Sequence, residues 1–378
     1  MSTEIKPFRI DIAQADLDDL ADRLARTRFT DPAPGETGAD EDSPYGVPVS
    51  RVRRLVERWR NGYDWRAWEA RLNAYPQFTT EIDGQTIHFL HVKSPEPDAL
   101  PLIVTHGWPG TVVEFLNVIG PLTDPRAHGA DPAQAFDLVI PSLPGFAFSG
   151  PTTDGGWGTE RTAKAWVELM HRLGYERYGA IGNDGGSMVS PEVGRHDPEH
   201  VVGVHVTQVF SFPSGDPAEF EGMSPEELEG MQVLKWFWEE KGAFNQLQSQ
   251  QPQSLAHALA DSPAGLLGWM AQLIDDAQGD DFIITNVALH WLTGTAGSAI
   301  RFYYENAHAG QQQAEPTTVP LGLGQAKSGD FVSIRRFADR DHKNIVSWNT
   351  IDAVGHYTAH SAPSAYAGDV RAFFAKLS

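Results

Sequence analysis

The 378-residue chain contains no cysteine, so disulfide bonds and thiolate metal sites are excluded. Long apolar runs are also missing, and no stretch reaches the roughly 18 consecutive apolar residues that a membrane-spanning helix needs. The first residues carry no apolar segment of the kind found in signal peptides. We therefore expect a cytoplasmic protein that neither crosses nor enters a membrane.

Positive charge is scarce. Lys and Arg number 29 against 50 Asp and Glu, which gives a formal net charge of −21. This balance disfavours nucleic acid and anionic membrane surfaces as partners, since both attract basic proteins. The hydrophobic content of 41% is ordinary for a globular protein, and the length allows about two domains.

The chain divides into four segments by pattern. Residues 1–77 predict three short helices whose apolar faces are too broken for a core of their own, so this segment should wrap the remainder. In residues 78–211, short β-branched runs alternate with helical stretches, a pattern typical of a parallel sheet covered by helices on both faces. Residues 212–300 break that alternation and predict a helical lid. Strands and a last helix return in residues 301–378, and the predicted strands lie at 79–82, 86–92, 102–104, 136–140, 178–181, 201–206, 319–325 and 345–351.

A Gly-x-Asp-x-Gly turn follows the run at 178–181 and precedes a helical stretch. This is the layout of a nucleophile elbow, a tight strand-to-helix turn that presents one side chain above a parallel sheet. The presented residue is Asp184, flanked by Gly182 and Gly186. Ser187 cannot replace it, because Val189 stands where the second glycine of a serine elbow would be. A carboxylate nucleophile restricts the chemistry to alkyl-ester intermediates.

Further motifs stand at other predicted strand ends. His106–Gly110 follows the strand at 102–104, where α/β-hydrolases supply one N–H of an oxyanion hole. The residue after the nucleophile supplies the other, so Trp108 and Gly185 are the candidate donors. Gly355-His356 ends the last strand and offers a base. The order nucleophile, acid, histidine is that of an α/β-hydrolase.

Together these stretches resemble the microsomal-type epoxide hydrolases over nearly the whole chain. The resemblance implies an α/β-hydrolase fold with a helical lid and the family's N-terminal segment, in a soluble bacterial-type relative without the mammalian membrane anchor. It is carried by Pro7–Phe29, His106–Gly110, Pro141–Ser149, Arg301–Asn306 and Asn344–Trp348.

The resemblance also implies roles for individual residues. Asp184 is the nucleophile, His356 the base, and Tyr303 the lid tyrosine that donates to the epoxide oxygen. Asp330 is taken as the acid that orients His356, since it follows a strand and stands 26 positions before the histidine. The other candidates, Asp339 and Asp341, are read as surface charges flanking Arg340.

The chain departs from the family at two positions. Phe244 stands where a second lid tyrosine is usual, and a phenyl ring cannot donate a hydrogen bond, so it is read as a pocket residue beside Trp108. Gly185 replaces the tryptophan that often follows the nucleophile. This keeps the N–H and predicts open space beside Asp184, consistent with a bulkier substrate.

The predicted function is hydrolysis of an apolar or aromatic epoxide to a vicinal diol, without metal or organic cofactor. His196 and His200 have the spacing of helical metal ligands, but Pro198 interrupts the helix, so no metal site is predicted. A haloalkane or haloacid dehalogenase is one alternative, disfavoured because Gly185 removes a common halide donor. A catalytically silent ligand-binding relative is another. Relatives are often dimers, so a homodimer is an expectation.

Overall fold

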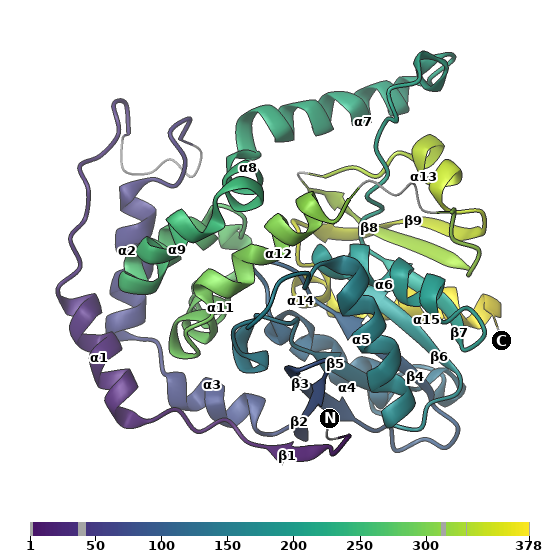
Figure 1. Cartoon of the computed structure of the whole chain (residues 1–378), viewed down its shortest axis with the longest axis horizontal. Coiled ribbons are helices and arrows are strands. Elements are labelled where there is room, and N and C mark those ends of the chain that lie inside the picture. Colours follow the sequence, from purple (N-terminus) through teal and green to yellow (C-terminus); the bar gives the residue numbers. More distant parts are fainter. Residues whose placement is uncertain (1–2, 37–42, 311–314, 330, 378) are drawn as a thin grey trace.

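One mixed sheet organises the chain. The computed structural model describes residues 3–36, 43–310, 315–329 and 331–377, and its nine strands lie in the order β1-β2-β3-β5-β4-β6-β7-β8-β9 (Figure 1). The strands are β1 (Lys6–Phe8), β2 (Gln77–Ile82), β3 (Gln85–Val92), β4 (Leu100–Thr105), β5 (Phe136–Pro141), β6 (Tyr178–Gly182), β7 (Val201–Val206), β8 (Leu321–Ser328) and β9 (Ile345–Val354).

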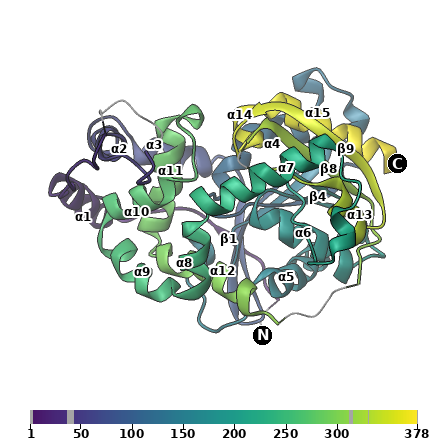
Figure 2. The same cartoon turned by 90° about the horizontal axis from the view of Figure 1, so that it is seen from above.

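The strands from β5 to β9 pair in parallel, and helices cover both faces of the sheet. Every residue of β5 and β6 is buried, as expected for strands covered on both faces. Helices α4 (Leu116–Thr123), α14 (Thr358–Ser361) and α15 (Pro363–Phe374) lie on one face, and α5 (Thr159–Arg172) and α6 (Gly185–His196) lie on the other (Figure 2). The predicted doubly covered parallel sheet is therefore confirmed.

Three antiparallel strands form one edge of the sheet. The hairpin of β2 and β3 turns at Asp83 and Gly84, which both have positive φ (51° and 76°), and this conformation matches the strand twist. Strand β1 adds to β2 as the outermost strand. Pairing with β2 thus places this N-terminal stretch in the sheet.

The N-terminal helices pack against the lid. They are α1 (Gln14–Ala25), α2 (Val49–Asn61) and α3 (Trp65–Leu72), and the apolar residues Leu20, Leu24 and Leu55 belong to the same continuous core as the sheet. Arginines on α2 face aspartates at the start of helix α11 (Asp280–Leu292). Arg58 holds Asp281 through two hydrogen bonds of 2.8 and 2.9 Å. The segment therefore joins the sheet edge to the lid (Figure 1).

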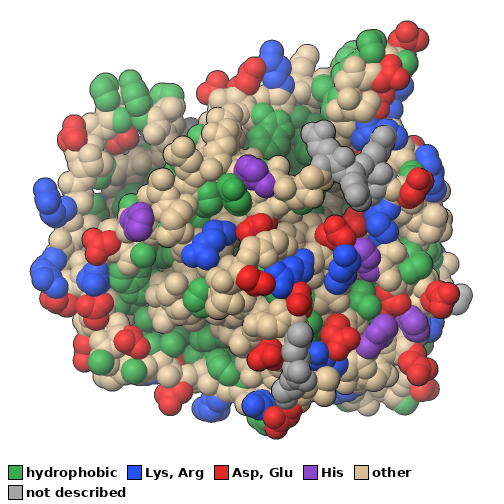
Figure 3. All heavy atoms as spheres, viewed as in Figure 1, with side chains coloured by type: hydrophobic (Ala, Val, Ile, Leu, Met, Phe, Trp, Pro, Cys, Tyr) green, Lys and Arg blue, Asp and Glu red, His purple; other side chains and the backbone are tan. Residues whose placement is uncertain are grey.

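The lid, described over residues 212–308, contains helices and loops but no strand, and the boundary predicted at 300/301 falls inside its last helix. No helix of the described chain is long and apolar enough to cross a membrane. On the face shown in Figure 3, acidic side chains are spread widely with basic ones between them.

The lid helices are α7 (Pro225–Trp236), a π-helical turn (Phe237–Lys241), α8 (Ala243–Gln250), α9 (Pro252–Asp261), α10 (Pro263–Ala271), α11 (Asp280–Leu292) and α12 (Ala296–His308); α13 (Arg335–Asp341) follows β8.

Candidate active site

Asp184 occupies a strained turn between β6 and α6. Its φ of 53° and ψ of −120° are costly for a residue with a side chain, and such strain is typical of functional sites. The flanking glycines have no room for a side chain. A Cβ at Gly182 would lie 1.9 Å from the carbonyl oxygen of Gly186, and one at Gly186 would lie 1.9 Å from that of Thr105. The turn thus aims the carboxylate away from the sheet.

The loop after β4 approaches this carboxylate closely. The backbone N–H of Trp108 donates to Asp184 Oδ1 at 3.0 Å, and a Cβ at Gly107 would collide with the same oxygen. His106 anchors the loop. Its Nδ1–H donates to the Gly107 carbonyl (3.0 Å), and its Nε2 accepts from the N–H of Leu143 (3.1 Å). Burial lowers the pKa of His106 to about 4, so the ring is neutral and can accept that bond.

Gly185 is the first residue of α6, so its N–H has no acceptor within the helix. The space beside it is not open, contrary to the prediction from the missing tryptophan. A Cβ at Gly185 would lie 3.2 Å from the ring of Phe302, a buried side chain on α12. Phe302 therefore occupies this side of the nucleophile, and the glycine provides no extra room for a bulkier substrate.

His356 lies just beyond β9 and faces the nucleophile. Its Nε2 lies 3.5 Å from Asp184 Oδ2, the oxygen that Trp108 does not contact. Its other ring nitrogen, Nδ1, lies 3.5 Å from the amide nitrogen of Gln208. The two oxygens of Asp184 thus face different groups, one an N–H donor and the other a base.

The predicted acid Asp330 lies outside the described residues, but the residues on either side of it, Gly329 and Phe331, are described. A Cβ at Gly329 would lie 3.9 Å from the carbonyl oxygen of Gly355, and Phe331 lines the same cavity as His356. The two alternative acids pair with arginines on their own helix, Asp339 with Arg335 (2.7 Å) and Asp341 with Arg340 (2.6 Å).

Gln208 is a site residue that sequence reasoning missed. Its side-chain oxygen accepts from the backbone N–H of Asp184 (2.8 Å) and from the hydroxyl of Thr207 (2.8 Å). These bonds orient the amide so that its nitrogen points toward His356. A signal was available, because Thr207-Gln208 directly follows β7, and polar residues at the carboxyl end of a parallel strand commonly face a ligand.

Tyr303 stands over the nucleophile within an aromatic cluster. Its ring packs edge-on against Trp108 (centroids 5.9 Å apart) and Phe244 (5.8 Å), and those two rings stack on each other at 5.8 Å. Burial and the negative charge of Asp184 raise the pKa of the Tyr303 hydroxyl well above its ordinary value. The hydroxyl therefore keeps its proton and remains a hydrogen-bond donor.

Trp108, Asp184, Gly185, Gln208, Tyr303 and His356 all line one cavity of about 490 Å³ between the sheet and the lid. This volume suits a small organic molecule. Asp184, His356 and Gln208 are among its polar wall groups. Nine of the other lining residues are aromatic: Trp108, Phe210, Phe212, Phe237, Trp238, Phe244, Phe302, Tyr303 and Phe331.

Glu114 is a second residue that sequence reasoning missed. It stands in an otherwise apolar run after the His106–Gly110 motif, and the structure buries it to 1% exposure near Gly110 and the Tyr357 ring. Burial, with the charge of Asp184 adding to it, raises the pKa of this carboxyl well above its usual range. A neutral acid here places no second negative charge beside the nucleophile.

Glu114→Gln is therefore expected to change how stability depends on pH. Since the folded pKa is raised, the contribution of Glu114 to stability is complete below its unfolded pKa near 4.3 and is lost as pH rises toward the folded value. The variant has no such loss. The difference in unfolding free energy, Glu114→Gln minus the unaltered protein, should therefore increase between pH 5 and 8, by up to about 1.4 kcal/mol per pH unit.

Urea unfolding at several pH values measures this difference. Glu229→Gln, at an exposed position on α7, is the matched control and should show no such slope. A difference between the Glu114 variant and the unaltered protein that stays constant with pH would contradict a neutral Glu114.

Comparison with sequence families gives two overlapping matches. The family described as "Epoxide hydrolase N terminus" matches residues 5–115, and the family described as "alpha/beta hydrolase fold" matches residues 101–250. The first match spans the N-terminal helices, the antiparallel edge and the Trp108 loop. The second begins at β4 and runs into the lid, and it confirms the predicted fold class.

Individual proteins match over nearly the full chain. A Stigmatella aurantiaca protein named "Putative epoxide hydrolase" is 39% identical over 99% of this chain and 85% of its own length. Epoxide hydrolase 1 of Sus scrofa is 29% identical over 99% of this chain and 89% of its own. Among solved structures, the Aspergillus niger epoxide hydrolase superposes with a TM-score of 0.86 at 29% identity, covering 99% of this chain and 97% of that one.

Proposed function

The chain belongs to the epoxide hydrolase family, and from this premise we propose that it converts an apolar epoxide to a vicinal diol through an ester on Asp184. The observation that carries the proposal is the convergence of a strained elbow carboxylate, a backbone donor, a histidine and a protonated tyrosine on one cavity. Each supplies a part of the two-step chemistry.

In the first step Asp184 attacks an epoxide carbon. Trp108 holds Oδ1, so Oδ2 is the oxygen available for attack, and Oδ1 becomes the carbonyl oxygen of the ester. The epoxide C–O bond breaks as the new O–C bond forms. Tyr303 donates its hydrogen bond to the oxygen that leaves the ring as an alkoxide, which lowers the barrier for a weak nucleophile.

In the second step water cleaves the ester. His356 lies on the Oδ2 side of Asp184 and takes a proton from the attacking water. The tetrahedral intermediate places its negative charge on Oδ1, where the N–H of Trp108 already lies and the N–H of Gly185 is free of helical bonding. Collapse breaks the bond to the alkyl oxygen and releases the diol. Neither step uses a metal or an organic cofactor.

The wall of the cavity supports an apolar substrate. Nine of its lining residues are aromatic and present apolar faces, whereas its polar lining residues are Asp184, His356, Gln208, Asn245, Ser249, Gln272, Asp275 and Asn306. An aryl or branched alkyl epoxide would bury its apolar part against these rings. A homodimer and a cytoplasmic location remain predictions from the sequence.

A panel of aryl and alkyl epoxides tests the proposed function, with diol formation followed by chromatography. The expected result is turnover, fastest for the apolar members, and no halide release from a parallel panel of haloalkanes. Halide release without diol would favour a dehalogenase. Saturable binding with no product from either panel would indicate a silent ligand-binding relative.

Asp330→Asn is expected to lower kcat by about 100-fold or more, because His356 would lose the carboxylate that orients and supports it. Support for this role comes from the positions of Gly329 and Phe331 beside Gly355 and the cavity. The loss should fall on ester hydrolysis, measured by rapid-quench kinetics, with little change in ester formation.

Asp339→Asn is the matched control, since its carboxylate pairs with Arg335 on an exposed face of α13. It should change kcat by no more than about twofold. Equal losses in both variants, or a normal rate of ester hydrolysis in Asp330→Asn, would remove Asp330 from the proposed mechanism.

A further inference from the structure

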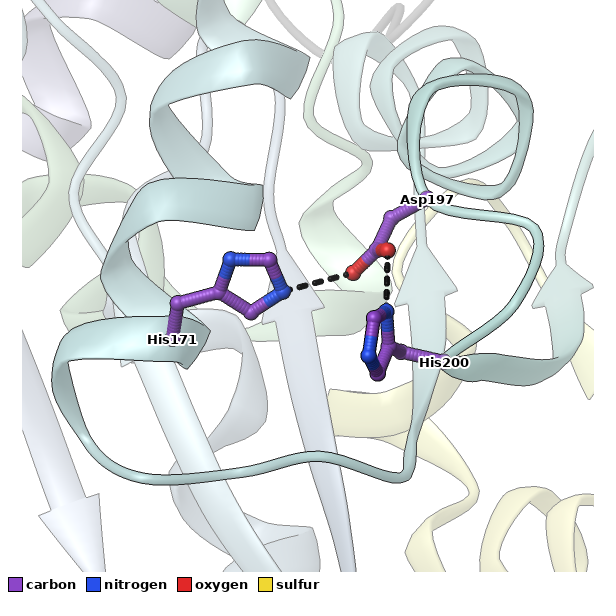
Figure 4. A group of neighbouring side chains, drawn as sticks. All are labelled: His171, Asp197 and His200. Carbon is purple, nitrogen blue, oxygen red and sulfur yellow. Dashed lines mark hydrogen bonds and ion pairs between the residues drawn. The ribbon is translucent and has the colours of Figure 1, made fainter.

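Two histidines and an aspartate meet at the end of the sheet opposite the cavity (Figure 4). His171 lies in the last turn of α5, Asp197 ends α6, and His200 immediately precedes β7. The backbone N–H of Tyr178, the first residue of β6, donates to the carbonyl of His200 at 3.0 Å. This cluster therefore sits at the amino ends of β6 and β7, whereas Asp184 follows the carboxyl end of β6.

The side chains converge on one point. His171 Nε2 lies 3.1 Å from Asp197 Oδ2, and His200 Nδ1 lies 2.5 Å from Asp197 Oδ1. The candidate ligand atoms of all three residues lie within 4.8 Å of one another. A tetrahedral ion with bonds of about 2.0–2.1 Å needs ligand atoms roughly 3.3 Å apart. Small rotations of the two rings would open that space.

We propose that His171, Asp197 and His200 bind a divalent transition-metal ion, with Zn²⁺ as the best match. Two imidazole nitrogens and one carboxylate oxygen form a ligand set that Zn²⁺ accepts, whereas Mg²⁺ and Ca²⁺ prefer oxygen ligands alone. Three protein ligands leave the fourth tetrahedral position for water.

The surroundings of the three side chains are those of a preformed binding site. The side chain of Asp197 is only 8% exposed, and its Oδ2 also accepts a 2.8 Å hydrogen bond from the buried hydroxyl of Tyr178. Such a donor fixes a ligating carboxylate in position. The rings of His171 and His200 are 43% and 35% exposed, so an ion can enter from solvent.

Nearby charge also favours a cation. The carboxylates of Glu199 and Glu176 lie close enough to act electrostatically on His200. Both glutamates are exposed. Their negative charge attracts a cation, while the buried Asp197 remains the carboxylate that binds it.

The sequence argued against a metal here because Pro198 breaks the helix that would pair His196 with His200. The structure offers a different partner. His171 arrives from α5, 26 positions before Asp197, and takes the place that His196 was considered for. The bound ion would join the end of α5 to the start of β7. Because it lies away from the cavity, it would stabilise the fold without taking part in turnover.

Equilibrium dialysis of untagged, chelator-treated protein against micromolar Zn²⁺ tests the proposal. The expected result is one Zn²⁺ per chain. His171→Gln and His200→Gln should each weaken binding by at least about tenfold. His257→Gln, which removes an exposed histidine on α9, should bind like the unaltered protein.

Thermal unfolding gives an independent measurement. A hundredfold excess of Zn²⁺ over its Kd should raise the Tm of the unaltered protein by about 3 °C. The same excess should leave the Tm of the two ligand variants unchanged, with circular dichroism confirming that each is folded.

Two results would overturn the site. One is the absence of stoichiometric Zn²⁺ binding by the unaltered protein, a result that does not depend on any variant folding. The other is stoichiometric binding retained in both His171→Gln and His200→Gln, which would place the ion elsewhere.

Discussion

A His356→Gln variant is expected to react once with its epoxide and then stop. Ester formation uses Asp184 and Tyr303 and should keep most of its rate, whereas ester hydrolysis loses the base that lies 3.5 Å from Asp184 Oδ2. Steady-state kcat should fall by about 10⁴-fold or more, as for loss of the histidine in other nucleophile–base pairs.

Intact-protein mass spectrometry after mixing with epoxide measures this trapped state. The protein should gain the mass of one epoxide per chain and keep it for many minutes. Asp184→Asn is the control and should gain no mass, since an amide is not a nucleophile of this kind. Turnover by His356→Gln at a rate near that of the unaltered protein would show that another group activates water.

Tyr303→Phe should slow ester formation by about 100-fold or more, the usual effect of removing one donor to a developing oxyanion. The described residues place no second tyrosine hydroxyl at the position of Phe244, whose ring lies 5.8 Å from that of Tyr303. Tyr303 should therefore carry most of the donation. Single-turnover kinetics in the His356→Gln background isolate this step from hydrolysis.

Two further variants sharpen this measurement. Tyr304→Phe changes a neighbouring exposed tyrosine that stacks on His308 (4.0 Å), and it should leave ester formation within about twofold. Adding Phe244→Tyr to Tyr303→Phe should restore part of the rate by supplying a hydroxyl from the facing side of the cavity. An unchanged rate in Tyr303→Phe would mean that a different group donates to the epoxide oxygen.

Local signals predicted the architecture well. Short β-branched runs predicted β2 to β9 within a few residues, because buried strands leave strong patterns in sequence. The Gly-x-Asp-x-Gly motif likewise predicted the elbow, since backbone crowding at Gly182 and Gly186 admits no other residue. These features depend on neighbours in the chain.

Features that depend on distant packing could not be predicted. The ring of Phe302 fills the space beside Gly185 from a helix more than 100 positions away, so the missing tryptophan gave a wrong expectation of open space. The burial of Glu114 and the orientation of Gln208 also arise only when several elements meet. The same holds for His171, which approaches Asp197 from another helix.

The most direct test of the proposed mechanism is a single turnover in ¹⁸O-labelled water with enzyme in excess over epoxide. If Asp184 forms the ester and water attacks its carbonyl carbon, the new diol oxygen comes from the unlabelled carboxylate. The label then enters Asp184, and the peptide that contains it should gain about 2 Da in the fraction of enzyme that has turned over, since one oxygen of the nucleophile is exchanged. Label in the diol, with none in that peptide, would mean direct attack of water on the epoxide and would contradict the mechanism.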